Sequence, residues 1–232
     1  MKFQPLTELE SQVYTIIQKY LKTHKQFDLK SLLPTCFKIL GSSYSEIDIT
    51  KAATSLIEKR YFIEGTTLTR DDIAGNLQRK KILQFIQINP GAYNRQIRRE
   101  LNLGSNEFNW HMGMLEKFGF IKKVAFDQHS FGYFENKSYM EHEFDLYLLQ
   151  NEKIRLILDY LERTPSTLSN LAREINMHYS TVQKHLQELE ERELVIGKDE
   201  GKHRVYHLNS DMRIKLQKIV NGQLFIDFAE TV

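Results

Sequence analysis

Residues Tyr179–Val195 read YSTVQKHLQELEERELV, and a related stretch, SNEFNWHMGMLEKFGFI, occurs 74 residues earlier at Ser105–Ile121. In both stretches the apolar residues recur at the spacing of one helix face. Each stretch then ends in apolar residues typical of the start of a strand. Two copies of one pattern at a constant spacing predict repeated structural units.

A third copy, fainter than the other two, lies upstream. IEKRYFI at Ile57–Ile63 aligns with LEKFGFI at Leu115–Ile121. This register places Ala53 at the position that His111 and His185 share in the other copies. The shared histidines suggest a structural or phosphate-contacting role. We therefore interpret the chain as three tandem copies of one unit.

Each clear copy predicts three helices and a β-hairpin. In the middle copy, Asn102-Leu103-Gly104 is a tight turn between the second and third helices, which makes a helix-turn-helix element. The hairpin that follows is a wing with a polar tip at 127–130. Ser180–Gln183 has the form of a capping box and predicts a helix start there. The expected helices are 76–87, 94–101, 105–118, 151–163, 167–175 and 178–193, and the expected strands are 120–126, 131–134, 195–198 and 202–208.

The first copy departs from this plan. Its third helix begins at Ser45 with the acids Glu46 and Asp48, its wing is reduced to 64–67, and Thr69 has the residue type of a helix cap. The expected fold is mainly α with short β-hairpin wings, in three tandem winged-helix domains. Their expected bounds are 1–70 for a divergent N-terminal winged helix, 71–138 for a central winged helix-turn-helix, and 139–232 for a C-terminal winged helix-turn-helix with a terminal helix.

Two further segments carry expectations. The stretch from Ser138 to Glu162 contains no Gly or Pro, which predicts either an ordinary helix packed on the middle copy or a helical strut between two copies. The C-terminal residues are more apolar than a free tail needs, which favours docking or a homodimer. These apolar residues are Leu216, Ile219, Val220, Leu224, Phe225 and Phe228.

The composition restricts the class of protein. Lys and Arg number 32 against 30 Asp and Glu, so a basic patch, if present, must be local. The single cysteine, Cys36, excludes an intrachain disulfide and a thiolate-rich zinc site. The sequence contains neither an apolar run long enough to span a bilayer nor an apolar signal-peptide core. We therefore expect a soluble, cytoplasmic protein with no membrane insertion.

Two motifs carry a resemblance to a known family. They are Asn89–Ala92 with Ile97–Leu101, and Tyr179–Glu190. Through them the chain resembles the two-module winged helix-turn-helix transcriptional regulators common in archaea and, more broadly, the ArsR- and MarR-like repressors. The likeness covers roughly residues 76–209. It implies a DNA-binding transcriptional regulator whose partner is double-stranded DNA.

The candidate DNA contacts lie where a recognition helix would face the groove. Short polar side chains can read base edges, and cations can bind phosphates. Arg79, Lys80 and Lys81 precede the middle element, where they either add phosphate contacts or form an ordinary solvated helix face. For Trp110, a core position is favoured over base stacking. The candidates are Arg95, Arg98, Arg99, Ser105, Asn106, Asn109, Trp110 and His111 in the middle copy, and Tyr179, Ser180, Thr181, Gln183, Lys184, His185, Lys202, His203 and Arg204 in the last.

Charge by segment favours the middle copy as the main DNA reader. Residues 71–138 hold 10 cations and 7 anions, whereas residues 139–232 hold 12 and 16. Residues 1–70 are interpreted as a unit for contact with a protein partner, dimerisation or spacing. The rival interpretation is a protein-binding scaffold without nucleic acid, as in ESCRT-type subunits and polymerase or chromosome adaptors.

Motifs for catalysis are absent from the sequence. It contains no glycine-rich phosphate loop followed by Lys, no dinucleotide fingerprint and no His-Glu-x-x-His, and Glu141-His142-Glu143 lacks the helical histidine pair. Cys36 lies in an apolar stretch and is expected to pack rather than to act as a nucleophile. We therefore expect no enzyme activity and no cofactor.

Overall fold

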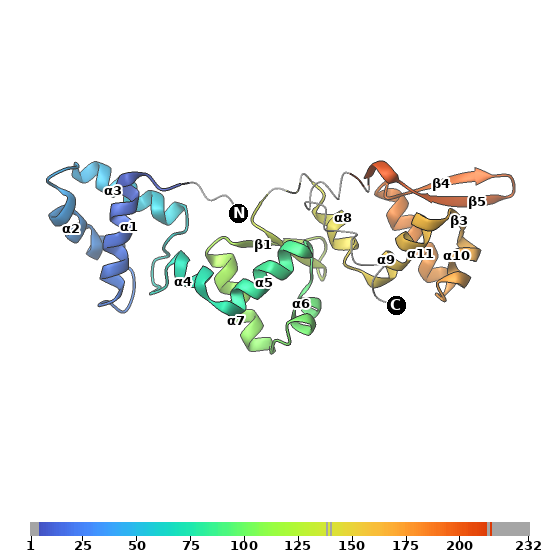
Figure 1. Cartoon of the computed structure of the whole chain (residues 1–232), viewed down its shortest axis with the longest axis horizontal. Helices are drawn as coiled ribbons and strands as arrows, with labels where there is room; N and C mark the ends of the chain where they lie inside the picture. The colour runs from blue at the N-terminus through green and yellow to red at the C-terminus, as the bar shows by residue number, and fades with distance from the viewer. Residues whose placement is uncertain (1–4, 138, 140, 213, 215–232) are drawn as a thin grey trace. The chain divides into compact units, whose positions relative to one another are not determined.

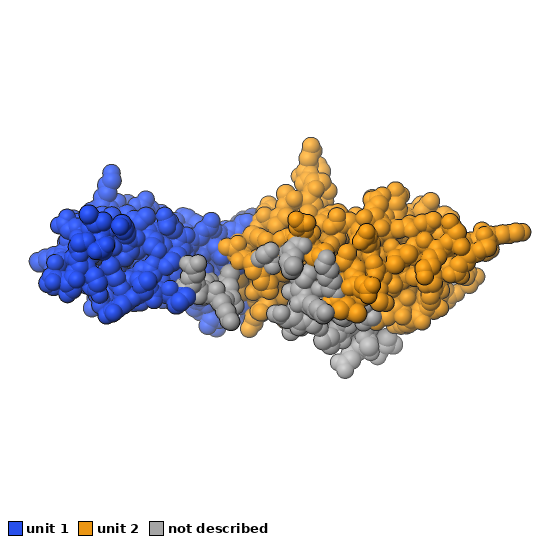
Figure 2. All heavy atoms as spheres, turned by 90° about the horizontal axis from the view of Figure 1, so that it is seen from above, with its two compact units in different colours: residues 1–81, 104–120 blue, residues 82–103, 121–232 orange. Residues whose placement is uncertain are grey.

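The computed structural model describes residues 5–137, 139, 141–212 and 214. The chain divides into two compact units, coloured separately in Figure 2: unit 1 comprises residues 1–81 and 104–120, and unit 2 comprises residues 82–103 and 121–232. The domain bounds expected from the sequence stay predictions. The expected terminal helix and the apolar residues from Leu216 to Phe228 lie outside the described residues.

Unit 1 is built from helices. They are α1 Glu8–Leu21, α2 Leu29–Leu40, α3 Glu46–Glu58, α4 Arg70–Gly75, the first residues of α5 Leu77–Ile88, and α7 Ser105–Lys117 (Figure 1). The apolar faces of the first three helices form one core, which includes Val13, Leu32 and Leu56. Cys36 is buried in it, and burial raises the pKa of its thiol to about 11, so this cysteine packs as expected.

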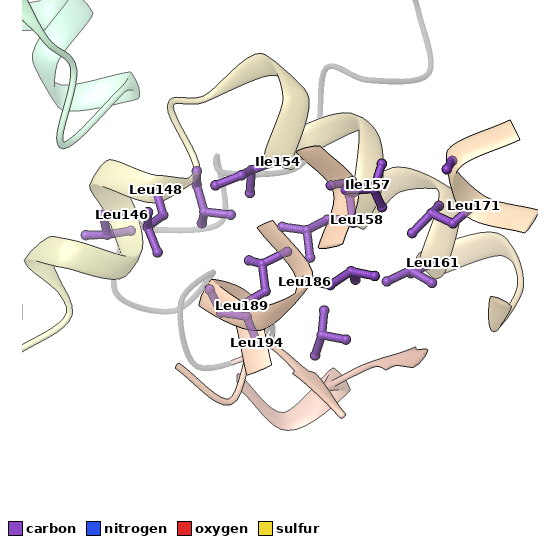
Figure 3. Close-up of a cluster of buried hydrophobic side chains, with 14 of the residues drawn as sticks. Leu146, Leu148, Ile154, Ile157, Leu158, Leu161, Leu171, Leu186, Leu189 and Leu194 are labelled. Carbon is purple, nitrogen blue, oxygen red and sulfur yellow. The ribbon is translucent and has the colours of Figure 1, made fainter. Parts of the chain in front are cut away.

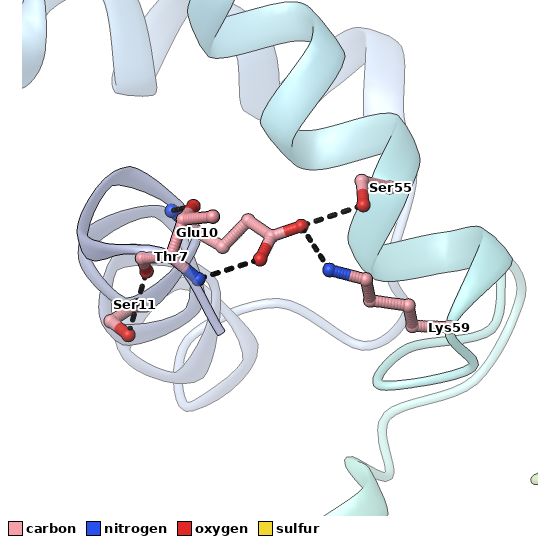
Figure 4. Close-up of polar contacts among 5 residues, drawn as sticks. All are labelled: Thr7, Glu10, Ser11, Ser55 and Lys59. Atoms are coloured by element: carbon pink, nitrogen blue, oxygen red, sulfur yellow. Dashed lines mark hydrogen bonds and ion pairs between the residues drawn. The ribbon is translucent and has the colours of Figure 1, made fainter. Parts of the chain in front are cut away.

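A buried carboxylate fixes α1 on α3. Thr7 and Glu10 form a capping box at the start of α1. The Glu10 carboxylate also accepts hydrogen bonds from Ser55 Oγ and Lys59 Nζ, both at 2.6 Å (Figure 4). At the next helix start, Thr69 caps α4 in a second capping box with Asp72, as the sequence predicted.

Unit 2 holds the remaining helices and the described strands. Its elements are the rest of α5, α6 Asn94–Glu100, β1 Ile121–Ala125, β2 Phe131–Glu135, α8 Glu143–Leu148, α9 Glu152–Arg163, β3 Ser166–Thr167, α10 Leu168–Glu174, α11 Tyr179–Glu191, β4 Val195–Glu200 and β5 His203–Leu208. β1 and β2 pair antiparallel as one hairpin. β3, β5 and β4 form an antiparallel three-stranded sheet.

A hydrophobic core of unit 2 joins α8, α9 and α11. Figure 3 shows side chains of α8, α9 and α11 meeting in it, among them Leu146, Leu158 and Leu189. Residues 151–208 thus form a complete winged helix-turn-helix with its own hairpin. α11 begins one residue before Ser180, because the His178 side chain caps it by accepting the Ser180 N–H at 3.3 Å. The predicted capping box at Ser180–Gln183 is therefore wrong.

The connector is not a continuous strut. It breaks at Leu149–Asn151 into α8 and α9, so the strut prediction is wrong and the ordinary-helix alternative fits. Gly91 lets α8 approach closely: its φ is +89°, and a Cβ there would lie 2.7 Å from the Tyr147 backbone nitrogen. The buried Gln150 side chain accepts from Gln96 at 3.0 Å and donates to the Pro90 carbonyl at 3.1 Å, which fixes α8 further.

The repeat is visible in local geometry. α3, α7 and α11 each have 13 residues, and their starts are displaced by 59 and then 74 residues. Each is followed by a residue with positive φ, namely Arg60, Gly119 and Glu193. The first copy is therefore displaced from the middle copy by 59 residues, one more than the match of apolar residues predicted. Ala52, rather than Ala53, corresponds to His111 and His185.

The chain around α3 retains a trace of a wing. The Phe27 N–H donates to the Thr66 carbonyl at 2.8 Å, and the Gly65 N–H donates to the Phe27 carbonyl at 3.0 Å. These bonds correspond to the bridge between Ala92 and Tyr133 and to the β3–β5 pairing. Residues 5–66 contain no strand. In the first copy, the two hydrogen bonds of Phe27 therefore take the place of the hairpins found in unit 2.

Candidate nucleic-acid interface

The exposed face of α11 is polar along its first two turns. Tyr179, Ser180, Gln183 and Lys184 are exposed, whereas Val182 and Leu186 point into the core. The sequence forms this surface because the apolar residues follow one helix face and leave the opposite face to polar side chains. Gln187, one turn beyond Gln183, is also exposed and was missed, although its i, i+4 spacing could have found it.

Two expected contacts of α11 lie deeper. Thr181 is partly buried. Only 12% of the His185 side chain is exposed, and its Nδ1 lies 3.6 Å from Glu188 Oε2. A side chain this enclosed supports packing and is poorly placed to reach a phosphate.

The β4–β5 wing carries the other expected cations of this copy. Lys202 and His203 are exposed at its tip. Arg204 instead forms ion pairs with Glu190, at the far end of α11, and with Asp199 at 3.5 Å. Gly197 makes room for this clamp, since a Cβ there would lie 2.5 Å from Arg204 Nε. Arg204 therefore holds the wing to α11.

In unit 1, α7 shows a comparable polar face. Ser105, Asn106, Asn109 and Trp110 are exposed. Trp110 is 53% exposed, so the preference for a core position was wrong, whereas Phe108 is buried as expected.

His111 lies on the inner side of α7. Its side chain is buried, with 6% of the residue exposed, which corrects its expected place among the outward residues. Burial, together with the charge of Arg79, lowers the pKa of His111. The neutral imidazole therefore prevails at neutral pH, and it offers no cation to a phosphate.

Arg79 is buried and is not the surface cation that the sequence suggested. It is 2% exposed, and its guanidinium lies over the Trp110 ring, 4.7 Å from the centroid. Its Nη1 donates weakly to the Asp72 carbonyl at 3.4 Å, and burial lowers its pKa. Arg79 supports the Trp110 ring from below rather than adding a surface charge, whereas Lys80 and Lys81 remain exposed.

The arginines of α6 differ from one another. Arg95 is exposed. Arg98 is partly buried and donates to the Leu103 carbonyl at 3.3 Å. Arg99 pairs with Glu100 at 2.8 Å and with Glu152 at 3.2 Å. One of the three is thus fully available to a phosphate within unit 2.

A metal centre and a membrane span have no candidate among the described residues. Over the described part of the chain, no group of three or more His, Cys, Asp or Glu side chains is arranged to hold a metal ion. None of the helices seen there combines the length and the apolar character needed to cross a bilayer.

Comparisons with known proteins agree with this geometry. Residues 152–196 match the IclR helix-turn-helix domain, and residues 76–122 match a winged helix-turn-helix DNA-binding family. The chain is also 30% identical over 186 residues to a protein of Methanocaldococcus jannaschii described as an uncharacterized HTH-type transcriptional regulator. The aligned region is 79% of this chain and 46% of that protein, so the chain spans about half the length of this curated relative.

Proposed function

We propose that this protein is a transcriptional regulator that binds duplex DNA through its C-terminal winged helix. The start of α11 enters the major groove, and the β4–β5 wing lies along the phosphate backbone. Gln183 reads base edges, while Lys184 and Lys202 bind phosphates.

The observation that carries the proposal is the exposed face formed by Tyr179, Ser180, Gln183 and Lys184. It combines short hydrogen-bonding groups with a cation at the helix start, where groove readers make base contacts. It also lies within the segment that matches the IclR helix-turn-helix domain. Two acids at the C-terminal end of α11 do not face the proposed groove contact: Glu190 holds the wing, and Glu191 lies at the opposite end of the helix.

A second contact is proposed for the middle copy. α7 offers Asn106, Asn109 and Trp110 on one exposed face. Asn109 occupies the position in α7 that Gln183 occupies in α11. Both side chains carry an amide, which can pair bidentately with adenine.

Residues 1–70 are proposed to be a divergent winged helix that contacts protein. Glu46 and Asp48 stand at the start of α3, where a groove-reading helix would meet phosphate. Ile47 between them is 67% exposed. Negative charge beside an exposed apolar residue favours a protein surface, or a second copy of this chain, over DNA.

The test is selection of a preferred duplex by the full chain, followed by anisotropy titrations of the single-site variants. We expect Gln183→Ala to reduce discrimination at one base pair by about 1–3 kcal/mol, and Asn109→Ala to do the same at another. Gln18→Ala, an amide of α1 in unit 1, is the control and should leave base preference unchanged. Absence of any duplex preference in the wild type, or equal effects of all three variants, would refute the proposal.

A further inference from the structure

A cleft of about 660 Å³ opens within unit 2 beside the exposed face of α11. Its walls come from α6, the tip of the β1–β2 hairpin, α8, the start of α9 and α11. Its volume falls in the range of small-molecule sites. Lys184 lies on its wall as well as on the face proposed to bind DNA. Whatever fills the cleft therefore meets a residue of the proposed DNA interface.

Three cations of the cleft are unpaired within the described structure. Arg95, Lys153 and Lys184 are exposed, and none of them forms an ion pair with another described residue. They come from three separate elements, α6, α9 and α11. Their convergence on one hollow places three cations, without ion-pair partners among the described residues, where they can attract an anion.

Each acid of the cleft has a contact of its own, and one of them, Glu152, is paired with an arginine. Glu152 pairs with Arg99 at 3.2 Å, and Glu188 lies 3.6 Å from His185. Asp127 accepts two backbone N–H groups of the hairpin tip, each at 2.7 Å. Four cationic side chains line the cleft against three carboxylates, so its net charge is positive although acids and bases both line it.

Aromatic rings form another part of the lining. Tyr93, Phe144 and Tyr147 contribute to it. Phe144 and Tyr147 are stacked with their centroids 6.2 Å apart, and Phe126 supports Tyr147 at 4.8 Å. A phosphodiester backbone would use the cations and leave these rings unused, whereas a planar organic ligand would use both.

We propose that this cleft binds a small organic anion with an aromatic ring, and that the bound anion weakens DNA binding by occupying Lys184. The ring packs against Phe144 and Tyr147, and the carboxylate, sulfonate or phosphate group pairs with Lys184 and Lys153, while Arg95 adds positive charge on the facing wall. The ligand site stands on the cleft alone, while its effect on DNA rests on the proposed function.

The test uses 8-anilinonaphthalene-1-sulfonate, which combines aromatic rings with one anionic group. Its fluorescence is titrated against the full chain, against Lys153→Gln and Tyr147→Leu, and against the control Lys30→Gln, which removes an exposed charge of α2. We expect saturable binding to the wild type and the control, roughly fivefold weaker in Lys153→Gln because one charge-assisted contact is lost. Tyr147→Leu should weaken binding as well, with the charges intact. Absence of saturable binding, or equal binding by Lys153→Gln and Lys30→Gln, overturns the site.

A second arm measures the affinity for a labelled duplex with and without the same probe. We expect the probe to lower DNA affinity in the wild type and to have less effect in Lys153→Gln. Probe binding without any change in DNA affinity overturns the regulatory half of the proposal. A chain that binds the probe but binds no duplex at any probe concentration supports the cleft and refutes the proposed function, so the two failures are distinguishable.

Discussion

The regions around α3 and α11 share a framework and differ in the surface they present. Both helices have 13 residues and are followed, two residues later, by a residue with positive φ. In both, the cation directly after the helix pairs with a buried carboxylate. Lys59 pairs with Glu10 at 2.6 Å, and Arg192 pairs with Asp145 at 2.7 Å. The buried residues and the ion pair after the helix thus have the same structural role around α3 and around α11.

The outer positions of the same two helices have diverged. Where α11 begins with Tyr179 and Ser180, α3 begins with Glu46 and Ile47. Two charges are kept at corresponding exposed positions: a positive one at Lys51 and Lys184, and a negative one at the last residues, Glu58 and Glu191. The comparison shows that one scaffold can serve two surfaces, because packing depends on the inner residues and binding on the outer ones. We infer that DNA binding belongs to α11 and not to α3.

Removal of a core leucine should separate the two regions most strongly. Leu56 and Leu189 occupy corresponding positions, and both are fully buried. We expect Leu56→Ala and Leu189→Ala each to lower the free energy of unfolding of its own region by about 2–5 kcal/mol, since each leaves a cavity. Thermal denaturation followed by circular dichroism measures this. Leu189→Ala alone should also reduce DNA affinity, and an equal loss in Leu56→Ala would break the comparison.

The Glu10 carboxylate predicts a pH dependence specific to the α1–α3 region. Burial alone would raise its pKa, but the hydrogen bonds from Lys59, Ser55 and the Thr7 backbone outweigh burial and lower the pKa from 4.5 to about 2. A pKa lowered by folding stabilises the native state above the unfolded value, and this stability is lost as pH falls from about 4.5 towards 2.

Glu10→Gln should therefore destabilise this region by about 2–3 kcal/mol at neutral pH, with a difference from wild type that shrinks in acid. Glu8→Gln removes the same charge from the exposed first turn of α1 and is the matched control. Denaturant unfolding at a series of pH values measures both. A Glu10→Gln effect that does not change with pH would contradict the assigned role of the carboxylate.

The helices were predictable from the sequence because their apolar stripes and turns are local signals. The predicted helix from 105 to 118 and the observed α7, Ser105–Lys117, differ by one residue at the C-terminal end. The start of α11 was missed because His178 is an uncommon cap, and the register of the first copy was missed because Leu56 and Ile57 are both apolar. Leu56 and Ile57 match Leu115 equally well as apolar residues, and only the position of the helix end shows that Leu56 is the counterpart.

The candidate interface was less predictable than the helices. Ser180, Gln183 and Lys184 are exposed as the helix pattern requires. Arg79 is buried and Trp110 is exposed, the reverse of what their residue types suggest, because the Trp110 ring covers the Arg79 guanidinium. This contact depends on packing between segments that are distant in sequence. Lys153, at the start of α9, stood in no motif. Its place beside α6 and α11 in the cleft follows from how α8 and α9 pack, which residue types alone do not reveal.

The salt dependence of DNA binding by Lys184→Gln and Lys51→Gln tests the central claim most directly. The two variants remove one exposed charge from corresponding positions of α11 and α3. We predict that Lys184→Gln binds duplex DNA more weakly and reduces the slope of log affinity against log salt by about 0.9, as the loss of one phosphate contact does. Lys51→Gln should match the wild type in both quantities. Equal slopes in the wild type and Lys184→Gln, or an equal loss in Lys51→Gln, would contradict the assignment of DNA binding to α11.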